Sequence, residues 1–120
     1  MDADRRQGKR FRLTGDRVGV CAVAGREAPL VLPILDVSRL GVLVRVPTAL
    51  AADWPGLGNL GPATLLFDQD RVIRVEVEVA WVGGERRPGS RTLSAGLRFC
   101  EPAPPGGELC AYLDSLEAPG

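Results

Sequence analysis

Most of the chain alternates apolar with polar residues, a period of two that is typical of β-strands with one buried face. Glycine, proline and short acidic runs interrupt the alternation and divide it into segments separated by turns. The pattern predicts six strands, over residues 17–24, 30–35, 41–46, 63–67, about 74–81 and 91–100. The first strand has an alternative start near Phe11, and Pro33 predicts an edge position or a bulge in the second.

The fifth predicted strand has the clearest alternation. Val75, Val77 and Val79 share one face, and charged side chains occupy the other. Trp81 falls in phase with these valines, so we expect it in the core. The alternative is an exposed indole that serves as a stacking surface.

The segments between and after these strands have other patterns. Apolar residues at helical spacing, Leu109, Tyr112, Leu113 and Leu116, predict an amphipathic helix over about 106–117. Proline and glycine predict a long loop at 47–62, with a helical turn around 49–53, a turn at 68–70 and a hairpin loop at 83–89.

Six short strands followed by one helix predict an all-β fold with a C-terminal helix, a six-stranded antiparallel barrel. Closure of the sheet removes exposed strand edges, and the helix is expected to cover an open end or a flank. We predict a single domain over 11–117, with the barrel at about 11–101 and the helix at about 106–117. Residues 1–12 form a charged, arginine-rich arm that is predicted to be flexible.

The composition argues against catalysis. Histidine is absent, which removes the commonest general base and the commonest metal ligand. Cys21, Cys100 and Cys110 lack the C-x-x-C spacing of zinc and redox sites, and we expect them to be reduced and mostly buried. With Lys9 as the single lysine, we predict a protein that is not an enzyme and that has no metal or cofactor.

The 15 basic and 15 acidic side chains cancel over the whole chain but not locally. Residues 1–17 contain six basic and three acidic side chains, a net charge of +3. No apolar run approaches the roughly 20 residues that a transmembrane helix needs, and no secretory signal comes after Met1. We therefore expect a cytoplasmic protein.

Two short motifs carry candidate chemistry. The first is the R-x-x-x-R of Arg6 and Arg10, which Arg5 precedes. This pattern is weak alone, because the chain is rich in arginine and repeats it at Arg87 and Arg91. The second, D-x-S-x-x-G over 36–41, lies at the junction of the second and third predicted strands and is more specific.

In the order and context of these motifs, the chain resembles the PilZ domain family, bacterial receptors for cyclic di-GMP. The resemblance covers nearly the whole chain, including residues 78–82 and 96–99, which are similar to the later strands of the family. It implies a six-stranded antiparallel barrel and a ligand site built from Arg5, Arg6, Arg10, Asp36, Ser38 and Gly41. Val42 stands where many members have a second glycine.

The chemistry of the ligand suits these residue types. Arg6 and Arg10 can each fork onto a phosphate or onto the O6/N7 edge of a guanine. Asp36 can accept from guanine N1–H and N2–H, and Ser38 can add one hydrogen bond. Gly41 would let the backbone approach the ligand.

The resemblance also suggests how binding would be transmitted. The arm would fold over the barrel when its arginines neutralise the phosphates, a disorder-to-order switch. An arginine directly before the first motif arginine, here Arg5, goes with an intercalated ligand dimer, so we expect two ligands per chain. The partner would be an unknown protein effector of motility, pili, exopolysaccharide synthesis or chemotaxis.

Each residue also has a purely structural interpretation. The arginines would be a solvated tail, Asp36 and Ser38 would cap a turn, and Gly41 would need a positive φ. Arg45 and Arg98 are expected to be solvated. Two other functions remain open: an adaptor of PilZ fold that binds no nucleotide, and, less favoured at zero net charge, a barrel that binds single-stranded nucleic acid.

Overall fold

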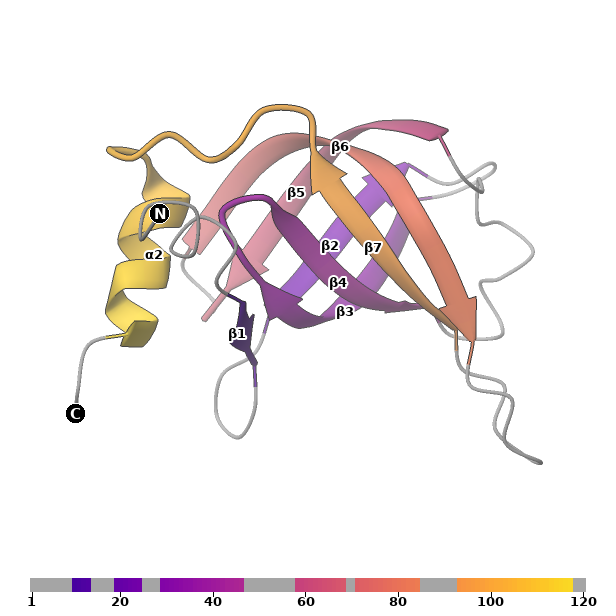
Figure 1. The fold of residues 1–120 in the computed structure, drawn as a ribbon, viewed down its shortest axis with the longest axis horizontal. Coiled ribbons are helices and arrows are strands. Elements are labelled where there is room, and N and C mark those ends of the chain that lie inside the picture. The colour runs from indigo at the N-terminus through magenta and orange to yellow at the C-terminus, as the bar shows by residue number, and fades with distance from the viewer. Residues whose placement is uncertain are drawn as a thin grey trace, which may run out of the picture.

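Six long strands pair in a closed antiparallel ring (Figure 1). The structure is a computed structural model and describes residues 10–13, 19–24, 29–46, 58–68, 71–84 and 93–117. The elements are β1 (Phe11–Arg12), β2 (Gly19–Ala24), β3 (Pro29–Val37), β4 (Gly41–Val46), β5 (Gly58–Phe67), β6 (Arg71–Gly84), β7 (Leu93–Phe99) and the helix α2 (Glu108–Glu117).

The ring runs in the order β3-β2-β5-β6-β7-β4 and closes where β4 pairs with β3. The two-residue strand β1 is added to the end of β3, with Phe11 opposite Val37 and Arg12 opposite Asp36. Phe11 therefore begins a strand of its own and does not extend the first predicted strand. The predicted six-stranded antiparallel barrel with a C-terminal helix is confirmed.

The alternation along the strands builds the core, as predicted. In β4, Val42, Val44 and Val46 are buried, whereas Arg45 is exposed. In β7, Ala95, Leu97 and Phe99 are buried in the same way. The other strands contribute the buried side chains of Cys21, Val23, Leu30, Leu32, Ile34, Val37, Ala63, Leu65, Phe67, Ile73, Val77 and Val79.

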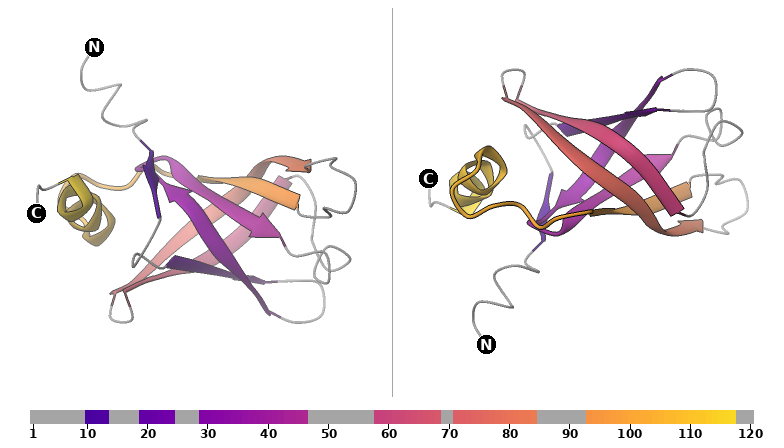
Figure 2. Two further views of the ribbon diagram at one scale, coloured as in Figure 1. Left: turned by 90° about the horizontal axis from the view of Figure 1, so that it is seen from below. Right: turned by 90° about the horizontal axis from the view of Figure 1, so that it is seen from above.

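The helix α2 lies at one end of the barrel (Figures 1 and 2). The Tyr112 ring stacks on the Phe67 ring of β5, with centroids 4.3 Å apart and 23° between the planes. Leu109 and Leu113 are buried beside it, and Leu116 is partly buried. The predicted apolar stripe of the helix is therefore the face that closes the barrel end.

Strand β5 starts earlier than the sequence predicts. Gly58–Pro62 belong to this strand, although the sequence places them in the long loop. Long-range pairing with β6 outweighs the local preference of glycine and proline, and a register shift near Gly61, whose φ is +92°, absorbs the irregularity. The predicted helical turn at 49–53 lies outside the described residues, and β6 continues to Gly84 into the predicted hairpin loop.

The cysteines are free, as predicted, but one of them is exposed. Cys21 and Cys110 are buried, whereas Cys100 lies at the surface after β7. Burial raises the pKa of the Cys21 thiol to about 12, so this thiol stays protonated at neutral pH. Among the described residues, no helix is both long enough and apolar enough to cross a membrane.

The inward orientation of β5 can be tested with two adjacent leucines. Leu65→Ala is expected to lower the free energy of unfolding by about 2–5 kcal/mol, because Leu65 is fully buried. Leu66→Ala removes the same atoms from a side chain that is 36% exposed, and it should cost less than about 1 kcal/mol. Urea denaturation followed by circular dichroism measures both. Equal costs would contradict the orientation.

Candidate functional site

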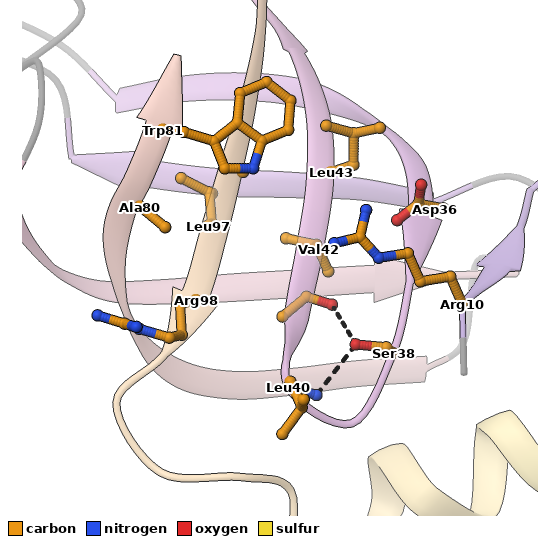
Figure 3. A pocket seen from close by; sticks show the side chains of 12 residues that line it. Arg10, Asp36, Ser38, Leu40, Val42, Leu43, Ala80, Trp81, Leu97 and Arg98 are labelled. Carbon is orange, nitrogen blue, oxygen red and sulfur yellow. Dashed lines mark hydrogen bonds between the residues drawn. The ribbon is translucent and has the colours of Figure 1, made fainter. Parts of the chain in front are cut away.

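A pocket of about 310 Å³ lies on the outer wall of the barrel, where the turn between β3 and β4 meets β4, β6 and β7 (Figure 3). We call it the site pocket. It is lined by Arg10, Asp36, Ser38, Leu40, Gly41, Val42, Leu43, Ala80, Trp81, Gly96, Leu97 and Arg98. Four of the predicted site residues, Arg10, Asp36, Ser38 and Gly41, therefore come together. Arg5 and Arg6 lie outside the described residues.

A β-bulge turns Asp36 toward the site pocket. Leu30, Leu32 and Ile34 of β3 point into the core, so continued alternation would send Asp36 there too. The register shifts by one residue at Leu35, so that Asp36 lies opposite Leu43 on the outer face and Val37 takes the inward place. The irregularity predicted from Pro33 thus falls two residues further along.

Asp36 is nevertheless only 9% exposed, and this burial raises the pKa of its carboxyl group above the usual range. The positive charges of Arg10 and Arg12 act in the opposite direction and lower that pKa. Figure 3 shows the Arg10 side chain reaching between Val42 and Asp36. The pocket therefore places a partly desolvated carboxylate next to an exposed guanidinium.

The turn from Ser38 to Gly41 is held by its own hydrogen bonds. The Ser38 amide donates to the Gly41 carbonyl at 2.9 Å, and the Leu40 amide donates to Ser38 Oγ at 3.1 Å. The Ser38 hydroxyl donates to the Gly41 carbonyl over a longer 3.5 Å. The structural interpretation of Ser38 as a turn cap is therefore confirmed, and the long second contact leaves its hydroxyl proton weakly held.

Gly41 is needed where β4 crosses close to β7. A Cβ at this position would overlap the Leu97 carbonyl oxygen and would lie 3.1 Å from Arg98 Cα. Gly41 has no positive φ, so that interpretation is wrong; among the described glycines, Gly61 alone has one. The glycine is required by the approach of two strands, and its predicted contact with a ligand stays a prediction.

The prediction that Trp81 belongs to the core is wrong. A second bulge, at Ala80, shifts the register of β6 so that Val79 pairs with Leu97 but Trp81 pairs with Gly96. This shift moves Trp81 to the outer face, where it is 41% exposed. Its indole lies against Gly96, since a Cβ there would come within 2.7 Å of Trp81 Cε2.

Sequence reasoning therefore assigns Trp81 to the wrong face. The apolar run from Ala80 to Val82, which breaks the alternation, is the available sign of a bulge. Figure 3 shows Trp81 on the side of the site pocket opposite to Arg10, with Leu43 between Trp81 and Asp36.

Arg98 lines the pocket but already has a partner. Its Nε lies 2.6 Å from Glu78 Oε1, and a terminal nitrogen contacts the same oxygen. Glu78 is the cross-strand neighbour of Arg98, and the Arg98 side chain is 65% exposed. In Figure 3 Arg98 points away from Arg10 and Asp36. With its described residues the pocket thus offers one carboxylate, one paired guanidinium, the guanidinium of Arg10, and a flat aromatic wall.

Comparison with solved structures identifies the fold. The chain is similar to the PilZ domain of YcgR from Escherichia coli, solved with c-di-GMP, at a TM-score of 0.74 and 18% identity over 94% of this chain and 92% of that chain. The chain is also similar to the MrkH–c-di-GMP complex of K. pneumonia, at a TM-score of 0.67 and 18% identity over 94% of this chain and 48% of that chain.

A third similar structure is the PlzA protein of Borreliella burgdorferi, also in complex with c-di-GMP. Its TM-score is 0.53 and its identity is 11%, over 98% of this chain and 56% of that chain. This chain thus spans about half the length of MrkH and PlzA. No protein-family model and no curated protein matches the sequence. The predicted resemblance to PilZ domains is confirmed, and the fold is that of a PilZ domain.

The neighbourhood of Asp36 can be tested by titration. Arg10→Ala is expected to raise the pKa of Asp36 further, because it removes one of the two charges that lower it. Arg45→Ala removes an equal charge from an exposed position of β4 and should leave the pKa unchanged. Carbon-13 NMR of the Asp36 carboxyl group over a pH series measures both. If Arg10→Ala does not raise the pKa of Asp36, the result would contradict the placement of the Arg10 guanidinium next to this carboxyl group.

Proposed function

We propose that the chain is a non-catalytic receptor that binds cyclic di-GMP in the site pocket and transmits binding to a protein partner. One observation carries the proposal. Arg10 and the Asp36–Gly41 motif, far apart in the sequence, line a single pocket on the outer wall of a barrel with the PilZ fold. The predicted cytoplasmic location belongs to the same proposal.

The pocket suits a guanine. Asp36 would accept from N1–H and N2–H, a charge-assisted pair that favours the ionised carboxylate and so offsets the effect of burial on its pKa. Trp81 would stack on a purine face, since Gly96 leaves its indole flat against the strand. The weakly held Ser38 hydroxyl can turn toward a ligand acceptor without breaking the bond from Leu40.

The phosphates would be bound by the arginines of the first motif. Arg98 is already neutralised by Glu78, so we assign the phosphates to Arg10 and to Arg5 and Arg6 before it. Arg10 precedes β1, which is anchored next to Asp36. From this position the arm would reach the site from its edge, and phosphate binding would draw residues 1–9 across the pocket, creating the surface that a partner recognises.

Calorimetric titration with cyclic di-GMP tests the proposal. Arg6→Ala, Asp36→Asn and Trp81→Ala should each weaken binding by about 5- to 150-fold, the value of a bidentate contact or of one stacked base. Arg45→Ala and Asp114→Asn change the same charges at exposed positions outside the pocket and should bind as the wild type does.

If the folded wild-type chain does not bind cyclic di-GMP, the result would contradict the receptor function and favour an adaptor that binds no nucleotide. Salt-dependent binding of single strands, without binding of the cyclic dinucleotide, would favour the nucleic-acid barrel.

The ligand stoichiometry is a separate prediction. The wild-type chain should saturate at two nucleotides, as an intercalated dimer, because Arg5 precedes the first motif arginine. Arg5→Leu should saturate at one nucleotide while Arg6 and Arg10 still bind. Saturation of the wild type at one nucleotide would contradict the dimer and would leave binding itself intact.

A further inference from the structure

A larger hollow, separate from the site pocket, runs between β6 and the connection of residues 100–107 that leads from β7 to α2. We call it the groove; its volume is about 630 Å³. In the part of the chain that the structure describes, the groove and the site pocket have no lining residue in common. Figure 1 shows the connection passing over the barrel toward the helix at its end.

The groove combines an apolar floor with an acidic rim. Ile73, Phe99 and Leu109 line it with side chains that are at least nine-tenths buried. Glu76, Glu101 and Glu108 line it as exposed residues, and Arg74 is the single basic residue among the described residues of the lining. The rim therefore carries a net negative charge, although the whole chain is neutral.

The wall of the groove is preorganised. The Cys100 amide donates to the Glu76 carbonyl at 2.8 Å, which ties the start of the connection to β6. Further along, the Gly107 amide donates to the Pro104 carbonyl at 2.9 Å. A binder would meet a surface whose backbone is already ordered, which lowers the entropic cost of association.

The same wall is bonded to the turn that lines the site pocket. The Phe99 amide donates to the Leu40 carbonyl at 2.8 Å, and the Ala103 amide donates to the Arg39 carbonyl at 2.9 Å. Arg39 and Leu40 lie between Ser38 and Gly41, inside the motif. A shift of this turn on ligand binding must therefore move, or be resisted by, the wall of the groove.

We propose that the groove binds a basic segment of a partner protein, with arginine or lysine on the acidic rim and an apolar side chain on the floor. We propose further that the shared turn couples this binding to the site pocket, a part that rests on the proposed function. Charge complementarity selects a basic occupant, and the buried floor selects one that also carries an apolar anchor.

A peptide titration of the full-length, nitrogen-15-labelled chain tests the groove. The probe is an acetylated and amidated pentapeptide that alternates arginine with leucine, expected to bind in the millimolar range. Amide shifts should be largest at residues 73–76 and 99–109 and should otherwise extend to the coupled turn at residues 38–41. The same peptide with glutamate for arginine, or with serine for leucine, should produce no such shifts. Shifts of equal size with either control, or no shifts at these amides, would overturn the proposal.

Matched variants sharpen this result. The double substitution Glu76→Gln and Glu101→Gln should weaken peptide binding by about fivefold, because it removes two exposed ion pairs with the peptide. Asp68→Asn with Asp114→Asn removes two charges from exposed positions outside the groove and should change nothing. Glu108 is left intact because it stabilises the first turn of α2.

Other occupants have their own outcomes. If the peptide binds only after Arg5, Arg6 and Lys9 are changed to glutamine, the occupant of the groove is the chain's own arm, residues 1–12. Shifts at these amides that depend on protein concentration, without peptide, would assign it to a second copy. Either result would overturn the proposal of a separate partner.

The coupling is read from the same titration with saturating cyclic di-GMP. The peptide affinity should change at least threefold, and by linkage the nucleotide affinity should change by the same factor when peptide is present. An unchanged peptide affinity would overturn the proposed coupling and would leave the proposal of peptide binding in the groove intact. If the nucleotide does not bind, the proposed function and the coupling fail together. The peptide titration without nucleotide still tests whether the groove binds a basic segment.

Discussion

The candidate site depends on two β-bulges, at Leu35 in β3 and at Ala80 in β6. In a strand, alternation sends every second side chain inward, and a single extra residue reverses that assignment for the rest of the strand. Without these insertions Asp36 would enter an apolar core, where an unpaired carboxylate is strongly unfavourable, and Trp81 would be turned away from the pocket. The bulges convert two core positions into the two walls of one pocket.

Two glycines let the strands around that pocket come close together. Gly41 accepts the backbone of β7 against β4, and Gly96 accepts the indole of Trp81 across β7. β7 therefore sets the distance between the carboxylate side and the aromatic side of the site pocket. A Cβ at either position would push a wall of the pocket outward. These glycines serve packing first, and through packing they shape the site.

The turn from Ser38 to Gly41 joins the two hollows of the molecule. Its inner hydrogen bonds present Ser38 to the site pocket, while its outward carbonyls, on Arg39 and Leu40, hold the segment that walls the groove. A short turn bonded on both sides has few ways to rearrange by itself. Under the proposed coupling, a ligand bound in one hollow would therefore act mechanically on the other.

The strand order in the sequence, the helix stripe and the two motifs were readable from the chain alone, because alternation, helical spacing and motif chemistry are local properties. β4, β7 and α2 have the predicted pattern, and the spacing of the second motif singled out Asp36, Ser38 and Gly41, which line the site pocket. The face of Trp81, the start of β5 and the close approach of strands that requires Gly41 were not readable. Each is decided by the register with a strand distant in sequence, β7 for Trp81 and Gly41 and β6 for β5. Local sequence therefore determined which segments become strands, whereas only the closed barrel decided which side chains face one another, because register is a property of pairs of strands.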